Sequence, residues 1–213
     1  PDDTCTSAWR DGENWYILQP ASEQPAPSEQ SPDATPADSH EVRLIHTGDT
    51  LSAVWAIGNN DICKVHHWSS DTTSESETIK FVQKMAPQVP IPEVINSWVD
   101  RERSFLVLKR VPGITLRDAW GTMSATQQDS ILNEVVYSCE RLASITSERL
   151  QNVSGGPDLH PNPEIEERFH LYHPDLGPGN ILIYNQRLAA IIDWECAGTR
   201  VSGSRRNLLY LGD

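Results

Sequence analysis

Apolar and polar residues alternate in short segments soon after residue 40. The segments EVRLIH (41–46), SAVWAIG (52–58) and DICKVHHW (61–68) are separated by residues that favour turns, including an Asn-Asn-Asp run. Alternation with a period of two over four to eight residues is typical of strands that bury one face. The pattern therefore predicts an antiparallel meander of strands.

A helical period replaces this alternation after Ser74. Ser74 and Glu77 have the spacing of a capping box, and Pro87 provides a stop signal. The apolar positions between these signals are Ile79, Val82 and Met85. We expect one helix of about three turns.

Two strands are predicted next, EVINSWVD (93–100) and RSFLVLKRV (103–111), separated by the charged turn DRER. Beyond Pro112 and Gly113 the period becomes helical again. Thr115 can cap a short helix, and Ser124 with Gln127 can open a long one. The apolar stripe of the long helix comprises Ile131, Leu132, Val135, Val136, Cys139, Leu142 and Ala143.

The last predicted strands are NILIY (180–184) and AAIID (189–193), on either side of the turn NQR. Strands, one helix, two strands, a Pro-Gly joint and a helical part together predict an α+β fold. A small antiparallel β-rich lobe precedes a helical one, and ligands bind preferentially at such joints.

The first 40 residues have a different composition. Residues 20–39 are rich in Pro, Ser, Glu, Gln and Ala, so they predict a disordered linker. The preceding AWRDGENWYILQ (8–19) can dock as a short strand or form a frayed terminus. We divide the chain into an N-terminal segment (1–40), an N-lobe (41–111) and a C-lobe (112–213).

Composition narrows the class of protein. The chain has 213 residues, of which 38% are hydrophobic, and its net charge is −13. These values favour a soluble globular protein that does not bind nucleic acid, and the apolar runs are too short for a membrane span. Four dispersed cysteines favour a reducing, cytoplasmic environment. The chain begins at Pro1, so it is either processed or incomplete.

Three features carry candidate chemistry. In HPDLGPGN, His173, Asp175 and Asn180 have the spacing H-x-D-x-x-x-x-N, which in phosphoryl transfer supplies a carboxylate for the attacking hydroxyl and an amide oxygen for magnesium. Asp193 ends an apolar strand, where a carboxylate can bind the same metal. Lys64 lies in mid-strand and suits a phosphate-binding cation. Each feature alone arises by chance, but the three occur in the right order.

The segments FHLYHPDLGPGNILI and AAIIDWECAG resemble the catalytic segment of the aminoglycoside phosphotransferase family, its fungal members in particular. The segments IPEVINSWVD and SFLVLKRVPGITLRDAW resemble the family's approach to the hinge. The similarity extends from about Glu41 to Gly198. It implies a two-lobed, protein-kinase-like fold and transfer of the γ-phosphate of ATP, with Mg²⁺, to a hydroxyl of a small-molecule acceptor.

The resemblance also implies roles for individual residues. Asp175 matches the catalytic aspartate, and His173 matches the residue that braces its loop. Asn180 and Asp193 match the magnesium ligands, and Lys64 matches the lysine on the α- and β-phosphates.

Further matches concern the nucleotide. Glu77 resembles the helix glutamate that holds the lysine, although the capping box offers a structural alternative and Glu75 is an equally exposed candidate. The remaining matches are the phosphate loop around Gly48 and Ser52, with one glycine, and an adenine-binding backbone from Lys109 to Val111.

Other residues leave alternatives open. Glu195, in the family's D-W-E triplet with Trp194, either supports the metal or bonds to the backbone. The scattered histidines indicate surface or structural positions rather than a metal site. These are His66, His67, His160 and His170.

The region after Glu195 departs from the family, whose members continue with helices that shape the acceptor pocket. We therefore expect a C-terminally short C-lobe, ATP binding with slow or absent transfer, and an exposed apolar surface. The alternative function is a truncated kinase-like module that binds a nucleotide or a partner without efficient catalysis. A protein kinase remnant is less well supported, because no A-P-E segment follows the HPDLGPGN loop.

Overall fold

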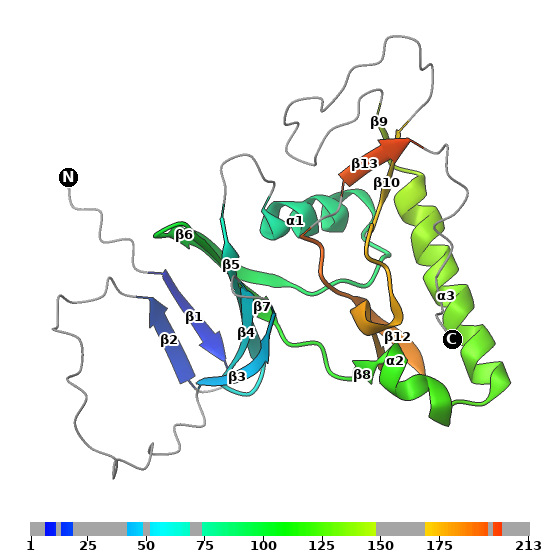
Figure 1. Ribbon diagram of the computed structural model, residues 1–213, viewed down its shortest axis with the longest axis horizontal. Helices are drawn as coiled ribbons and strands as arrows, with labels where there is room; N and C mark the ends of the chain where they lie inside the picture. Colours follow the sequence, from blue (N-terminus) through cyan, green and yellow to red (C-terminus); the bar gives the residue numbers. More distant parts are fainter. Residues whose placement is uncertain are drawn as a thin grey trace, which may run out of the picture. The chain divides into compact units, whose positions relative to one another are not determined.

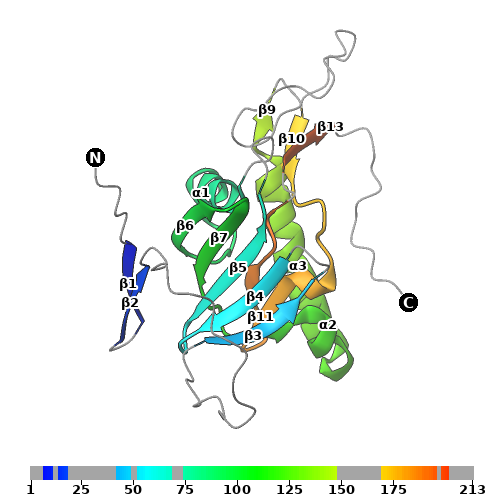
Figure 2. The same cartoon turned by 60° about the vertical axis from the view of Figure 1, so that its left-hand side comes forward.

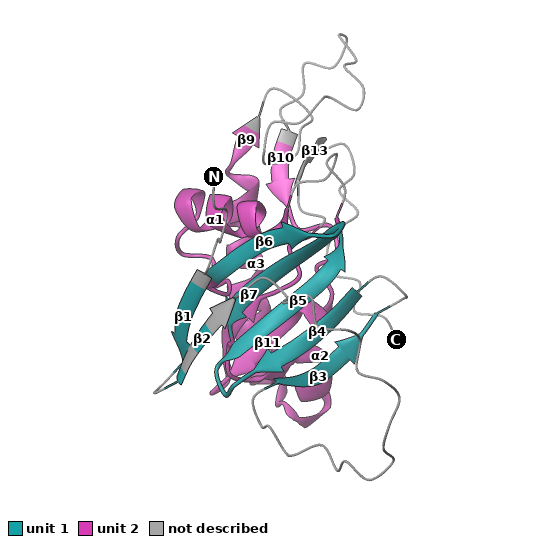
Figure 3. Cartoon of the chain, turned by 90° about the vertical axis from the view of Figure 1, so that its left-hand side faces the viewer, with its two compact units in different colours: residues 1–67, 95–109 teal, residues 68–94, 110–213 magenta. Residues whose placement is uncertain are grey.

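The structure is a computed structural model (Figure 1). It describes the following residues: 7–11, 14–18, 42–48, 52–68, 74–147, 169–195 and 198–201. The predicted linker, residues 20–39, lies outside these ranges. The chain divides into two compact units, coloured separately in Figure 3. Unit 1 comprises residues 1–67 and 95–109, and unit 2 comprises residues 68–94 and 110–213.

Unit 1 is built on a five-stranded sheet, in the order β3-β4-β5-β7-β6 (Figure 2). Its strands are β3 (Val42–Thr47), β4 (Ser52–Ile57), β5 (Asp61–His67), β6 (Val94–Asp100) and β7 (Arg103–Lys109). The pairs β3–β4, β4–β5 and β5–β7 are antiparallel. The predicted strands and their antiparallel meander are therefore confirmed, with β7 placed between β5 and β6.

The turn between β6 and β7 matches the predicted charged turn. Its two central residues, Arg101 and Glu102, both have positive φ angles, 46° and 60°. Two left-handed residues in succession give the turn a twist that matches the twist of the flanking strands. The hairpin therefore forms although neither residue is glycine.

The N-terminal segment contains a second sheet in unit 1. Strands β1 (Ser7–Asp11) and β2 (Asn14–Leu18) pair antiparallel as a hairpin, with Asp11 opposite Asn14. The rings of Trp9 and Tyr16 stack at 5.7 Å between centroids. Of the two alternatives that the sequence left open for this segment, the structure shows the strand.

Within the described residues of unit 2 the α-helices are α1 (Glu75–Met85), α2 (Leu116–Ala119) and α3 (Ala125–Ala143). The same residues include the 3₁₀ turns η1 (Trp120–Thr122) and η2 (Pro178–Asn180). Its short strands are β8 (Ile114–Thr115), β9 (Thr146–Ser147), β10 (Phe169–Tyr172), β11 (Ile181–Tyr184), β12 (Arg187–Ile191) and β13 (Gly198–Val201). They form two sheets, β13-β10-β9 and β12-β11-β8.

Helix α1 begins at the predicted capping box. The Ser74 hydroxyl accepts the backbone N–H of Glu77, and the Glu77 carboxylate accepts the backbone N–H of Ser74. Ile79 and Val82 are fully buried. Met85, the third apolar position at helical spacing, is the last residue of the helix and is 49% exposed. The face of α1 continues through Glu75 instead, which lies one turn before Ile79.

Helix α3 contributes to the core of unit 2 and contacts β10 and β12 (Figure 1). The buried cluster consists of Leu116, Ile131, Val135, Ile181 and Ile183. The predicted apolar stripe is confirmed at Ile131, Val135 and Leu142, whereas Val136 and Ala143 are exposed. The stripe on this helix is thus narrower than predicted.

Gly113 joins β7 to the helical part at a close approach of backbones. Its φ is 134°, and a Cβ there would lie 2.4 Å from the carbonyl oxygen of Ile183. Only glycine meets both requirements without strain.

Among the helices that the structure describes, none has the length and hydropathy needed to cross a membrane.

Candidate active site

The loop that follows strand β10 carries His173, Asp175 and Asn180. Asp175 is exposed at a turn, and Asn180 ends the 3₁₀ turn η2. The amide Nδ2 of Asn180 donates to Asp175 Oδ2 at 2.9 Å and to the Asp175 carbonyl oxygen at 2.8 Å. The sequence spacing H-x-D-x-x-x-x-N thus corresponds to a closed loop in which the amide orients the carboxylate.

Ile192, directly after strand β12, links this loop to Asp193. Its backbone N–H donates to the carbonyl oxygen of Asn180 at 2.9 Å, and its carbonyl oxygen lies 3.0 Å from Nε2 of His173. A carbonyl oxygen only accepts hydrogen bonds, so Nε2 carries the proton in this contact. The two hydrogen bonds hold the residue before Asp193 against both ends of the loop.

Asp193 has a left-handed backbone, with φ of 71°. Aspartate visits this region more readily than most residues, at a cost that its surroundings must offset. The following residue, Trp194, is fully buried and held at two points. Its backbone N–H donates to Glu75 Oε1 at 3.0 Å, and its indole Nε1 donates to the Ile191 carbonyl oxygen at 2.8 Å. These contacts fix the backbone on the C-terminal side of Asp193.

His173 is a buried side chain, 5% exposed, with its ring edge-on to Trp194 at 4.7 Å between centroids. Burial lowers the pKa of this imidazole below 6.5, although the Ile192 carbonyl and the carboxylates of Asp193 and Asp175 oppose the shift. At neutral pH the ring is therefore uncharged and bonds to the carbonyl oxygen of Ile192. Its position is that of a brace within the loop.

The side-chain oxygens in this region are of the kind that magnesium binds. Since Nδ2 of Asn180 donates to Asp175, the other side of the amide presents the oxygen Oδ1. Asp193, half-buried, adds a carboxylate within one residue of the hydrogen bond to Asn180. Magnesium prefers oxygen ligands and is usually held by one or two protein side chains together with substrate phosphates. The oxygens of Asn180 and Asp193 have the chemistry of such a pair, and their role as magnesium ligands stays a prediction.

The predicted phosphate-binding residues lie in unit 1. Lys64 is half-buried in the middle of β5, opposite Val54 in β4 and Leu106 in β7. Gly48 and Ser52 are both exposed, and Gly48 N–H donates to the Ser52 carbonyl oxygen at 3.1 Å. That hydrogen bond closes the base of the connection between β3 and β4, whose residues 49–51 lie outside the described ranges.

Two glutamates of α1 have different environments. Glu77 is exposed and takes part in the capping box, whereas Glu75 is 2% exposed and binds the backbone of Trp194. The expectation that the two are equally exposed was wrong. The signal for Glu75 is present in the sequence, because positions 75, 79 and 82 fall on one face of a helix. Lys64 belongs to unit 1 and both glutamates to unit 2, so the pairing of Lys64 with Glu77 stays a prediction.

Lys109 ends strand β7, and its side chain binds two carboxylates of unit 1. Nζ lies 3.1 Å from Asp61 Oδ1 and 3.6 Å from Asp11 Oδ1. The ammonium group of Lys109 is therefore paired with two buried carboxylates of its own unit. Contact of adenine with the backbone from Lys109 to Val111 stays a prediction. Glu195 is exposed, and both of its proposed roles remain open.

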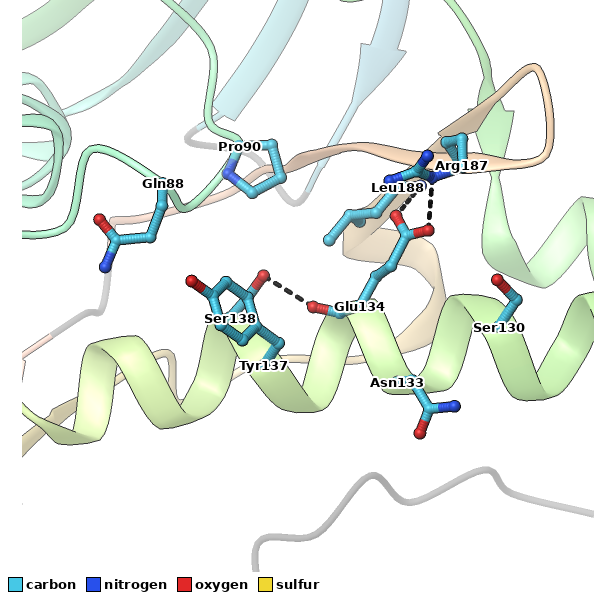
Figure 4. A pocket seen from close by; sticks show the side chains of 9 residues that line it. All are labelled: Gln88, Pro90, Ser130, Asn133, Glu134, Tyr137, Ser138, Arg187 and Leu188. Carbon is cyan, nitrogen blue, oxygen red and sulfur yellow. Dashed lines mark hydrogen bonds and ion pairs between the residues drawn. The ribbon is translucent and has the colours of Figure 1, made fainter.

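A pocket of about 560 Å³ in unit 2 lies between α3, strand β12 and the segment that follows α1 (Figure 4). Glu134 crosses one side of it, where its carboxylate binds the guanidinium of Arg187 and the backbone N–H of Leu188. The exposed side chain of Tyr137 lies on the helix side. The lining includes no predicted catalytic or metal-binding residue.

Comparison of the sequence with protein-family models and with curated proteins finds no match. Solved structures do match. A thermostable variant of aminoglycoside phosphotransferase APH(4)-Ia, in a ternary complex with AMP-PNP and hygromycin B, is 18% identical with a TM-score of 0.55. The match covers 75% of this chain and 68% of that chain.

Two further structures are similar to this chain. The streptomycin-ATP-APH(2")-IIa ternary complex is 17% identical with a TM-score of 0.54, and the match covers 75% of this chain and 67% of that one. The gentamicin-APH(2")-IIa complex is 18% identical with a TM-score of 0.57, covering 76% and 67%. These likenesses show that the chain has the two-lobed α+β fold of the kinase-like aminoglycoside phosphotransferases.

Proposed function

We propose that this protein is an ATP-dependent phosphotransferase that moves the γ-phosphate to a hydroxyl of a small molecule. The observation that carries the proposal is the hydrogen bond from Asn180 Nδ2 to Asp175 Oδ2. It orients a potential base and an amide oxygen in one loop, which Ile192 connects to the carboxylate of Asp193. In phosphoryl transfer the protein performs little covalent chemistry itself. Its main contributions are a positioned base and ligands for the metal ion.

In this proposal Asp175 accepts or orients the proton of the acceptor hydroxyl. Its side chain is exposed, so an acceptor can reach it, and the bond from Asn180 limits its rotamers. His173 holds the loop through Ile192 and stays uncharged. Asn180 and Asp193 would hold magnesium, which when bound neutralises charge on the phosphate oxygens. Lys64 of unit 1 would bind the α- and β-phosphates.

The acceptor is proposed as a class only. A net charge of −13 attracts cations over several ångströms, so a cationic molecule with hydroxyl groups would be concentrated near the protein. Structures with the same fold contain hygromycin B, streptomycin or gentamicin. A fold hosts many substrates, so we propose a cationic polyhydroxylated molecule without choosing among them.

The test begins with binding. Thermal unfolding is measured with ATP and Mg²⁺ and with ATP and a chelator. At a nucleotide concentration of a hundred times Kd, binding stabilises the fold by about 2.7 kcal/mol, and we expect a much smaller gain without the metal. Asn180→Ala is expected to abolish the difference, whereas Asn133→Ala, at an exposed position on α3, preserves it. Equal shifts with and without metal would contradict the assignment of Asn180 and Asp193.

Transfer is tested next, with labelled ATP and a panel of cationic polyhydroxylated acceptors. Formation of a phosphorylated acceptor that requires Mg²⁺ supports the proposed function. Metal-dependent binding of ATP without transfer to any acceptor would instead support the alternative, a kinase-like nucleotide-binding module.

A further inference from the structure

The end of the N-terminal hairpin binds the turn between strands β4 and β5. Asp11, the last residue of β1, is only 4% exposed. Its Oδ2 accepts the backbone N–H groups of Asn59 and Asn60 at 3.1 and 3.2 Å, and its Oδ1 accepts the side-chain amide of Asn60 at 2.6 Å. Three donors from one turn therefore converge on one carboxylate of the hairpin.

A second carboxylate, Asp61, lies just beyond this turn and is fully buried. Trp9 of the hairpin donates its indole N–H to Asp61 Oδ2 at 3.1 Å. Asp61 begins β5 directly opposite Lys109, the last residue of β7, and its Oδ1 accepts from the Lys109 ammonium at 3.1 Å. The same ammonium lies 3.6 Å from Asp11 Oδ1. One cation thus joins the hairpin to the end of strand β7.

The hairpin lies so close to the turn between β4 and β5 that position 58 of this turn requires a glycine. Gly58 has φ of 57°, and a Cβ on it would lie 2.4 Å from the Tyr16 hydroxyl and 2.6 Å from Asp11 Oδ2. The two causes are independent, because the first is a backbone conformation and the second is space. The contact between the hairpin and the sheet therefore combines close packing at Gly58 with the charged interactions of Asp11.

The charge of the Asp11 carboxylate helps to hold the Lys109 ammonium in place. Burial raises the pKa of Asp11, but the hydrogen bonds from Asn60 and Asn59 and the charge of Lys109 outweigh burial and lower it below 3.8. The Asp11 carboxylate therefore stays charged near neutral pH and attracts the ammonium. A buried carboxylate without a partner is costly, so displacement of Lys109 is unfavourable while the hairpin is docked.

We propose that the hairpin of strands β1 and β2 is a clamp on the end of strand β7, in which Asp11 is a positioning residue that acts through Lys109. The chain continues from Lys109 into Arg110 and Val111, the backbone expected to meet adenine. For this consequence the clamp rests on the proposed function. The clamp then sets the affinity for the nucleotide, while the residues that act on the phosphoryl group lie elsewhere in the chain.

The experiment compares Asp11→Asn with Asp100→Asn in the full chain. Asp100 is exposed at the end of β6 in the same sheet, so the control removes the same charge. In Asp11→Asn we expect amide exchange in a peptide spanning residues 103–111 to become about tenfold faster, equivalent to about 1.4 kcal/mol of lost protection. The Kd for ATP with Mg²⁺ is expected to rise about fivefold, with kcat within about twofold of wild type.

The outcomes separate the clamp from the proposed function. Unchanged exchange in residues 103–111, or an equal change in Asp100→Asn, overturns the clamp. Faster exchange with unchanged Kd overturns its role in nucleotide binding. If wild-type protein binds no ATP, the proposed function fails, and the exchange measurement still decides whether Asp11 positions β7. Should Asp11→Asn not fold, Trp9→Phe removes the donor to Asp61, replaces the indole beside Tyr16 with a smaller aromatic ring, and is expected to accelerate exchange less, about threefold.

Discussion

The aspartates Asp11 and Asp61 of unit 1 have surroundings that differ from those of Asp175 and Asp193 of unit 2. Asp11 and Asp61 in unit 1 are almost entirely buried, and their carboxylates bind backbone, indole, amide and ammonium donors of the same unit. Asp175 in unit 2 is exposed and is oriented by one amide, and Asp193 is half-buried. Buried carboxylates saturated by protein donors act as anchors, whereas an exposed, oriented carboxylate can act on a ligand.

Helix α1 shows the same contrast between a buried and an exposed carboxylate, in two glutamates that are two residues apart. Glu75 is buried and binds the backbone after Asp193, and Glu77 is exposed and caps the helix. Residue type and proximity in the sequence therefore do not distinguish the two roles. The direction of each side chain on the helix decides which donors it meets.

The largest expected effect tests Asp175 as the acting carboxylate. Asp175→Asn keeps an oxygen that can accept from Asn180 but cannot accept a proton. If the protein transfers phosphate, we expect kcat to fall by roughly 10²–10⁴, with the Kd for ATP nearly unchanged. Steady-state kinetics and calorimetry measure the two quantities. Asp129→Asn, at an exposed position on α3, is the control and should change neither. A comparable loss of ATP binding in Asp175→Asn would instead give this residue a structural role.

The next effect tests the anchor in unit 1. Lys109→Met removes the cation that both buried carboxylates share. We expect the free energy of unfolding to fall by about 2 kcal/mol, less than for a fully buried pair, because the Lys109 side chain is 42% exposed and solvent screens it. Urea unfolding measures the change, with Lys80→Met on the exposed face of α1 as control. Equal stability of the two variants would show that the carboxylates need no cation.

A smaller effect separates the two glutamates. Glu75→Ala leaves the buried N–H of Trp194 without its acceptor, so we expect a loss of roughly 1–2 kcal/mol in the free energy of unfolding. It should also weaken the Mg²⁺ dependence of ATP binding, because the backbone beside Asp193 is released. Glu77→Ala removes the capping partner of Ser74, at a cost of about 0.5 kcal/mol, and should leave the Mg²⁺ dependence intact. Equal Mg²⁺ dependence in both variants would contradict a role of Glu75 at the metal site.

The smallest effect is a dependence on pH. The folded state lowers the pKa of Asp11 below 3.8, so its contribution to stability is complete above that value and is lost as pH falls through the folded pKa. The difference in free energy of unfolding between wild type and Asp11→Asn is expected to be about 1 kcal/mol at pH 6 and to shrink below pH 4. Unfolding titrations at several pH values measure it, and a difference that stays constant down to pH 3 would argue against a charged Asp11.

The local structure could be predicted because its causes are local. Alternation placed β3, β4, β5, β6 and β7, and caps and turn residues placed the starts of α1 and α3. The residues of the H-x-D-x-x-x-x-N motif also interact at short range, since Asp175 and Asn180 lie five residues apart. A period or a spacing within one segment contains enough information for such elements.

The sequence by itself determined the strands of the five-stranded sheet, strands β11 and β12, the helices, the capping boxes and the loop that carries Asp175 and Asn180, but it predicted none of β8, β9, β10 and β13. Tertiary structure alone decided that the N-terminal hairpin docks, because its indole donor and the Asp61 acceptor are 52 residues apart. It also decided that Glu75 faces the interior, since its partner Trp194 is 119 residues away. Burial and donor supply arise when distant segments meet, and these quantities separate a carboxylate that anchors the fold from one that is available to a ligand.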